Sequence, residues 1–184
     1  MQVDRDIQAL EVAIAQMVQR QEQLQKTYLQ AIAPALRNRL FQAIFLFCTQ
    51  NCPEAFLSLS AIERCTLQRE LREIGGRAAE RLHTSSLPST DSIDAALSEV
   101  LGQSLSESQE LLSRYQISAP GQHIQLATME IETGDRTLMT LRGELRVLSA
   151  RHAQHLEQLR KKQWLKVVAT AEEAWRTAWV DPSD

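Results

Sequence analysis

The first thirty or so residues carry a regular alternation of apolar and polar positions. Apolar side chains recur at alternating spacings of three and four, and Gln21 is the one polar residue in a stripe made of Ile7, Leu10, Ile14, Met17, Leu24, Tyr28 and Ala31. This is the heptad spacing of a coiled-coil seam. Glutamines and charges fill the intervening positions, as on a solvated helix face. The pattern predicts a long N-terminal helix with one narrow apolar side.

Pro34 falls inside this helix, where a proline removes a backbone donor and either ends or kinks the helix. The chain beyond it is apolar on most sides, which is typical of a helix entering a core; its apolar residues are Leu36, Leu40, Phe41, Ile44, Phe45, Leu46 and Phe47. Pro53 marks the next stop. We therefore assign residues 1–51 to an N-terminal long helix, kinked near Pro34.

We expect residues 52–122 to form a helical head between the two long helices. Ser60 and Glu63 have the spacing of a capping box, so a helix should begin there. The segment 83–92 is polar and contains a proline, which indicates a linker. Ser104 and Glu107 form a second candidate box, so the stretch 93–115 fits either one helix or two.

A second heptad-like stripe occupies the C-terminal region, 123–184. It contains Ile131, Leu138, Leu141, Leu145, Leu148, Leu156 and Leu159. Gly134 and Asp135 are a candidate break and cap, and nothing stops a helix over 136–180. As α-helices, 4–51 and 136–180 would be about 72 and 67 Å long, so their lengths match. We expect an all-α fold in which both form an antiparallel coiled-coil hairpin, although the same stripes would also suit pairing between two chains.

Composition supports an ordinary cytoplasmic globular chain. Hydrophobic residues make up 43% and charged residues 23% of 184, and the longest apolar run is too short to span a bilayer. The N-terminal sequence lacks the features of a secretory signal, and three cysteines fit reduced thiols. The net charge of −3 is unevenly distributed, because 84–135 has eight acids and one base whereas 136–166 has eight bases and two acids.

Motifs for specific chemistry are missing, so we predict no enzyme, no cofactor and no metal. Cys48 and Cys52 share a helix face, but two close ligand pairs are the usual requirement for zinc, and we expect the cysteines, Cys65 included, to act as small buried hydrophobes. His152 and His155 lie at seam positions where leucine is expected. They predict a hydrated or pH-sensitive part of the helix pair.

All three tryptophans lie near the C-terminus, beside basic residues. The candidate contact residues are Arg160, Lys161, Lys162, Trp164, Lys166, Trp175 and Trp179. At 100° per residue the tryptophans fall within about 60° of one another, with Val168 in the same stripe. They either bury against Val3, Ile7 and Leu10, or anchor a protein partner, or contact an anionic membrane surface.

Two segments resemble a group of cyanobacterial helical proteins of unknown activity. They are Leu46–Gln50 with Glu54–Ser60, and Ala171–Trp179. The resemblance implies a cytosolic context in a cyanobacterium, with thylakoid association as one option, and carries over no activity, cofactor or site.

The leading functional hypothesis is a non-enzymatic interaction or scaffold protein with a protein partner, a homodimer being one form of it. Peripheral membrane attachment through the basic, tryptophan-bearing helix is the alternative. Nucleic-acid association is a third, weakened because the basic tract lacks the framing of any known nucleic-acid-binding motif.

Overall fold

The computed structural model describes residues 2–84 and 90–178. Within these ranges the chain is helical and contains no strand, which confirms the all-α class. The elements, in order, are α1 (Gln2–Leu46), a π-helical turn (Phe47–Asn51), α2 (Pro53–Ser58), α3 (Ala61–Thr84), α4 (Thr90–Arg114), α5 (Thr128–Glu132) and α6 (Arg136–Ala178). Trp179 and the core of the predicted linker, 85–89, lie outside the described residues.

The chain divides into two compact units. The hairpin unit contains residues 2–24 and 144–178, and the head unit contains residues 25–143 apart from 85–89. These boundaries differ from those predicted at 51/52 and 122/123, because part of α1 and the first turns of α6 pack with the middle helices. Each long helix therefore contributes to both units.

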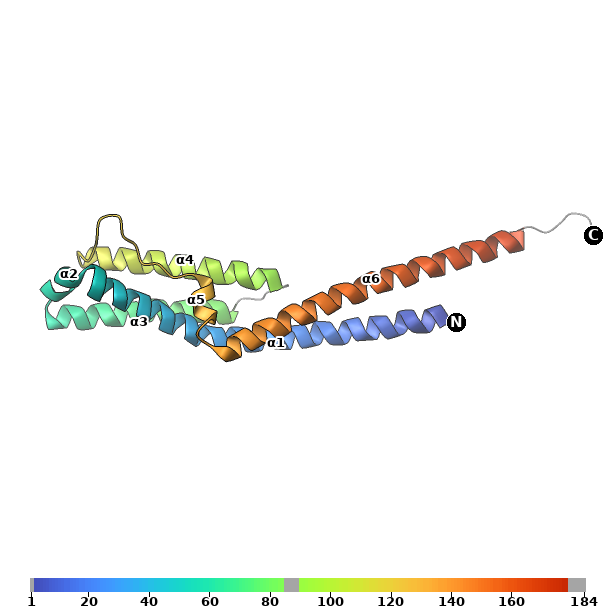
Figure 1. The fold of residues 1–184 in the computed structure, drawn as a ribbon, viewed down its shortest axis with the longest axis horizontal. Helices are drawn as coiled ribbons and strands as arrows, with labels where there is room; N and C mark the ends of the chain where they lie inside the picture. Colours follow the sequence, from blue (N-terminus) through green and yellow to red (C-terminus); the bar gives the residue numbers. More distant parts are fainter. Residues whose placement is uncertain (1, 85–89, 179–184) are drawn as a thin grey trace, which may run out of the picture. The chain divides into compact units, whose positions relative to one another are not determined.

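In the hairpin unit, α1 and α6 run side by side in opposite directions (Figure 1). The residues of the predicted seam lie on the less exposed side of α1. Leu24 is buried, and the half-buried residues are Ile7, Leu10, Ile14, Met17 and Gln21. The corresponding side of α6 contains buried Leu145, half-buried Leu148 and half-buried Leu159. We call these two sets of positions the seam. The predicted antiparallel hairpin is confirmed.

Local sequence signals set most helix ends. α1 continues through Pro34, while Pro53 occupies the first turn of α2, where its missing N–H costs nothing. The Ser60 capping box forms as predicted, since Glu63 N donates to Ser60 Oγ at 3.2 Å and Ser60 N donates to Glu63 Oε2 at 2.7 Å. These bonds hold the pKa of Glu63 below its usual value.

Residues 93–114 belong to one helix. α4 is continuous, because the Ser104 hydroxyl donates to the carbonyl of Val100 at 2.7 Å inside the helix instead of capping a new one. Glu107 instead accepts from Arg77 and Arg81 of α3, both at 2.8 Å. Of the predicted linker 83–92, residues 83–84 belong to α3 and residues 90–92 to α4, and the rest lies outside the described residues.

The C-terminal long helix, α6, begins at Arg136, where the predicted uninterrupted stretch 136–180 begins. Residues 122–127, which we call the extended segment, have no regular secondary structure, and α5 follows them before the chain turns at Gly134. Asp135 then caps α6, because its Oδ1 accepts from the backbone N–H of Thr137 at 2.8 Å and of Leu138 at 3.3 Å. The Gly134–Asp135 break thus works as its residue types suggested.

The head unit has an apolar core built from α1, α3, α4 and the extended segment. Its buried members are Leu40, Ile44, Phe47, Cys48, Cys52, Leu67, Leu71, Ile74, Leu111, Leu112, Ile117 and Ile124. Cys48 and Cys52 are buried as predicted, whereas Cys65 is exposed, since it lies on the solvent side of α3. Phe45 is also 57% exposed, so the stretch after Pro34 has one solvated side.

A polar cluster lies within this mostly apolar unit, centred on Arg142 of α6. Its guanidinium is paired with Asp94 of α4 and lies 4.0 Å from Glu132 of α5. The same guanidinium lies 5.6 Å from the ring centre of Tyr28 of α1, and the Tyr28 hydroxyl donates to Glu132. Arg142 is only 5% exposed, so its charge is held by these partners and not by solvent.

Candidate functional site

Two of the predicted contact residues hold the hairpin together. Lys162 Nζ lies 2.7 Å from Asp6 Oδ2, and Lys166 Nζ lies 2.6 Å from Asp4 Oδ1. The lysine later in α6 pairs with the aspartate earlier in α1, which is the register of two antiparallel helices. The pairing with Lys166 holds the pKa of Asp4 below its usual value, and Asp4 raises the pKa of Lys166.

The histidines of α6 also lie on the seam. His152 and His155 are half-buried at positions where the heptad pattern calls for leucine. His155 Nδ1 lies 2.9 Å from the carbonyl oxygen of Arg151, within hydrogen-bond distance of this acceptor. These residues therefore serve helix pairing and lie on a different side of α6 from the tryptophans.

The described tryptophans are mostly exposed. Trp164 is 65% and Trp175 is 67% exposed, so the first of the three alternatives, burial against Val3, Ile7 and Leu10, does not hold for either. The reason is helical phase. Trp164 follows the seam residue Leu159 by five positions, which is about 140° around the helix axis.

Around these tryptophans the last turns of α6 have a continuous apolar surface, which we call the outer face. It consists of Trp164, Val167, Val168, Ala171, Ala174, Trp175 and Ala178. At 100° per residue these side chains occupy an arc of about 120°. All are exposed except Val168, which is half-buried, and Val167 is 58% exposed.

The seam side of the same turns is polar. Beyond Lys162 the seam phase passes through Lys166, Thr170, Glu173 and Thr177. The apolar side of α6 thus moves from the face toward α1 to another face within a few residues. The outer face is therefore apolar surface that α1 does not cover.

Most of the basic side chains near the outer face are held in ion pairs. Lys161 pairs with Glu157 at 3.5 Å and Arg176 with Glu172 at 3.6 Å, in addition to the two lysines paired with α1. The bases are Arg160, Lys161, Lys162, Lys166 and Arg176, and the acids are Glu157, Glu172, Glu173, Asp4 and Asp6. With Arg5, which lies between Asp4 and Asp6 on α1, the region has six bases and five acids, and four of the bases are held in ion pairs.

Sequence reasoning identified the basic residues and the tryptophans but missed part of this surface. The alanines between the tryptophans and the exposed Val167 were not singled out, nor were the aspartates that take up Lys162 and Lys166. The phase signal was present in the sequence, as the five-residue step from Leu159 to Trp164.

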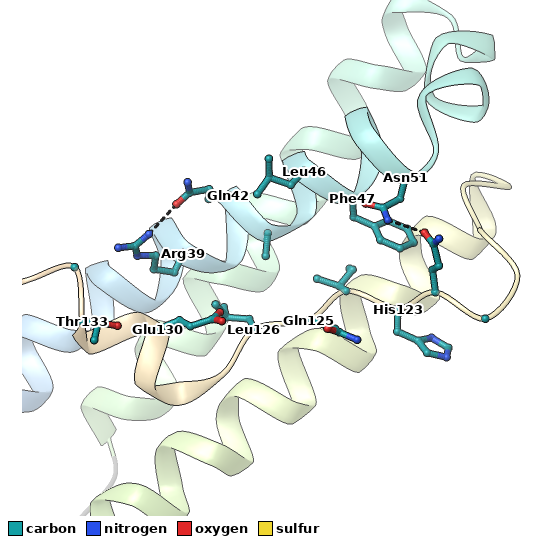
Figure 2. A pocket seen from close by; sticks show the side chains of 15 residues that line it. Arg39, Gln42, Leu46, Phe47, Asn51, His123, Gln125, Leu126, Glu130 and Thr133 are labelled. Carbon is teal, nitrogen blue, oxygen red and sulfur yellow. Dashed lines mark hydrogen bonds between the residues drawn. The ribbon is translucent and has the colours of Figure 1, made fainter.

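The head unit contains a groove of about 640 Å³ between α1 and the segment 121–134. In Figure 2, Arg39 and Gln42 line it from α1, while Leu126, Glu130 and Thr133 line it from the opposite side. Its polar groups bond mainly to each other: Arg39 Nη1 donates to Gln42 Oε1 at 3.1 Å, and Asn51 Nδ2 donates to Gln122 Oε1 at 2.6 Å.

The cysteines beside this groove are poorly suited to nucleophilic chemistry. Burial raises the pKa of the Cys48 thiol to about 11 and also raises the pKa of Cys52. A thiol is reactive as the thiolate, so both remain protonated near neutral pH. Over the described ranges, 2–84 and 90–178, no group of three or more His, Cys, Asp and Glu side chains is arranged to hold a metal ion.

The fold and the site together define an all-α helical hairpin with an exposed apolar face at the end of its last helix. No helix in the described part of the chain combines the length and apolar character needed to cross a bilayer. Comparison of the chain with protein-family models, with curated proteins and with solved structures gives no match. The resemblance to cyanobacterial helical proteins therefore stays a prediction.

Proposed function

We propose that this protein is a non-enzymatic interaction protein that uses the outer face of α6 to bind a partner protein. The observation that carries the proposal is the change of apolar side along α6. The seam side of α6 contacts α1 as far as Lys166, and the apolar side chains of the last turns are centred about 120° around the helix axis from it. A helix that presents Trp, Val and Ala at such spacing fits a hydrophobic groove or another helix.

Tryptophan suits such a role. Each tryptophan buries a large area, and tryptophans are enriched among the few residues that provide most of the binding energy at protein interfaces. Trp164 and Trp175 are separated by three helical turns, so they would anchor both ends of a contact about 16 Å long.

A membrane surface is a weaker candidate, for electrostatic reasons. Attachment of an amphipathic helix to anionic lipid needs basic side chains around the apolar face. Here Lys162 and Lys166 are paired with α1, while Glu172 lies beside the outer face and pairs with Arg176. The same pairing removes two cations from the tract that would contact nucleic acid.

The proposal places the protein in the cytoplasm. Cys48 and Cys52 are free, protonated thiols in the core, and free thiols are typical of a reducing compartment. The resemblance to cyanobacterial helical proteins suggests the type of cell in which a partner should be sought.

A site-specific photo-cross-linker tests the proposal. Ala171 lies on the outer face and Ala169 lies about 160° away on the same helix; both are exposed alanines, so they form a matched pair. We expect the cross-linker at 171 to capture a discrete protein in cells, and the cross-linker at 169 to capture none. Equal capture at both positions, or capture of lipid alone at 171, would contradict the proposal.

A further inference from the structure

The outer face has a spacing that reads the same in both directions. Trp164, Val168, Ala171 and Trp175 are separated by four, three and four residues. In heptad terms they occupy successive d, a, d and a positions. We infer that the partner of the outer face is a second copy of this chain, bound antiparallel; the inference rests on the proposed function and names its partner.

Antiparallel pairing of two such helices brings unlike positions into register. Trp164 would lie opposite Trp175 of the second copy, and Val168 opposite Ala171 of the second copy. Large residues then meet at both ends, while the small Ala171 allows close approach beside the two-fold axis. A two-fold interface must be complementary to itself, and a palindromic spacing meets that condition.

Charge also favours a second copy. Identical chains bring like charges together wherever a charged residue lies near the two-fold axis. Between Trp164 and Trp175 the chain has three charged residues. Lys166 pairs with Asp4 of α1, and Glu173 lies on the same side of the helix as Lys166. Only Glu172 lies beside the outer face. In this register Val167 lies near Ala174 of the second copy and Leu165 near Glu172 of the second copy, so no like charges oppose each other.

The area of the contact predicts a weak dimer. A tryptophan buries roughly 150–250 Å² when it is fully enclosed, so four of them and the smaller residues would bury on the order of 1,000 Å² in total. Stable interfaces usually bury about 1,200–2,000 Å². We therefore expect association that depends on concentration, with a Kd on the order of micromolar or weaker.

Disulfide trapping tests both the partner and the orientation, on the full chain with the exposed Cys65 replaced by serine. Val168→Cys and Ala171→Cys are made as separate chains. In the antiparallel pair position 168 lies opposite position 171, within reach of a disulfide, whereas each lies farther from its own copy. We expect a 1:1 mixture of the two variants to form disulfide-linked dimers under a mild oxidant, and each variant alone to form few.

Sedimentation of the unmodified chain gives the second readout. We expect its mean mass to rise toward that of a dimer as concentration increases. The double variant Trp164→Ala/Trp175→Ala should weaken association by about tenfold or more, as expected for interface anchors. Val147→Ala, which changes an exposed apolar residue of α6 outside the outer face, should leave it unchanged.

The outcomes separate this inference from the proposed function. A chain that stays monomeric up to millimolar concentration, or cross-linking of each single variant with itself, overturns the antiparallel dimer. If the photo-cross-linker at 171 then captures a different protein, the interaction role stands with another partner. Capture of no protein overturns both.

Discussion

Lys162 Nζ lies 2.7 Å from Asp6 Oδ2, although 156 residues separate the two in sequence. The pair tests the register of the hairpin directly. Asp6→Lys should lower the free energy of unfolding by about 0.2–1 kcal/mol, the usual range for partly exposed ion pairs. Lys162→Asp in the same chain should restore much of that loss. Chemical denaturation of the unmodified chain, the two single variants and the double variant measures the coupling. Additive changes in the free energy of unfolding would show that the two side chains do not interact.

The neighbouring pair, Asp4 and Lys166, predicts how the hairpin responds to pH. Asp4 has a lowered pKa in the folded state, so its contribution is present above the ordinary aspartate pKa and is lost as pH falls through the lowered value. Lys166 has a raised pKa, so its contribution is complete below the ordinary lysine pKa and is lost as pH rises through the raised value. The pair should thus act over the whole neutral range.

An NMR titration of the Asp4 carboxylate checks this prediction. We expect Lys166→Gln to return the pKa of Asp4 toward its usual value, because Lys166 is the largest cause of the shift. Lys161→Gln is the matched control, since Lys161 pairs with Glu157 instead. An unchanged Asp4 pKa in Lys166→Gln would show that the ion pair does not form.

The Arg142 cluster should behave as a single energetic unit. Arg142→Met removes the buried charge that faces Glu132, and we expect a loss of about 3 kcal/mol in the free energy of unfolding. Adding Glu132→Gln removes the carboxylate left without its cation. The double variant should therefore lose less free energy of unfolding than the two single variants lose in sum. Additive losses would mean that Arg142 and Glu132 do not interact.

Tyr28 predicts a loss of stability in alkali. Burial, followed by its hydrogen bond to Glu132, raises the pKa of the phenol well above its usual value of 10.0. A raised folded pKa means that stability is complete below the unfolded pKa and decreases as pH rises above it. We expect Tyr28 to ionise only as the head unit unfolds, measured by tyrosinate absorbance in a Tyr115→Phe background. Ionisation of a folded head unit at the ordinary tyrosine pKa would contradict its burial.

Gly75 and Gly76 of α3 should respond differently to alanine. A Cβ at Gly76 meets nothing within 4 Å, so Gly76→Ala should stabilise the protein by about 0.5–1 kcal/mol through helix propensity. A Cβ at Gly75 would lie 3.0 Å from Cγ of Arg37, so Gly75→Ala should gain less or lose stability. Thermal unfolding compares the two, and an equal gain would show that Arg37 moves aside freely.

The sequence predicted what depends on neighbouring residues. The seam from Ile7 to Leu24, the Ser60 capping box and the Gly134–Asp135 break all rest on side chains a few positions apart, and all are present. The Ser104 box failed because the same spacing also suits a helix interior, where Ser104 bonds to Val100. A short pattern such as Ser-x-x-Glu therefore does not determine whether the serine caps a helix or lies inside one.

Features that join distant segments were not predictable in this way. The cluster of Tyr28, Asp94, Glu132 and Arg142 joins four helices, and no spacing indicates that these residues meet. The groove beside Arg39 likewise depends on how the extended segment lies along α1. The exposure of Trp164, in contrast, could be predicted from the sequence. Its position five residues after the seam residue Leu159 places it on another side of the helix.

The five-residue step from Leu159 to Trp164 makes the length of α6 as important as its composition. Two residues inserted after Lys161 would leave every apolar side chain intact and yet turn the outer face by about 200°, into line with the seam. The tryptophans would then face α1 instead of solvent. An insertion of a full seven residues would lengthen the helix and preserve the phase. The interaction surface is therefore specified by a residue count, which substitutions leave unchanged and small insertions or deletions destroy.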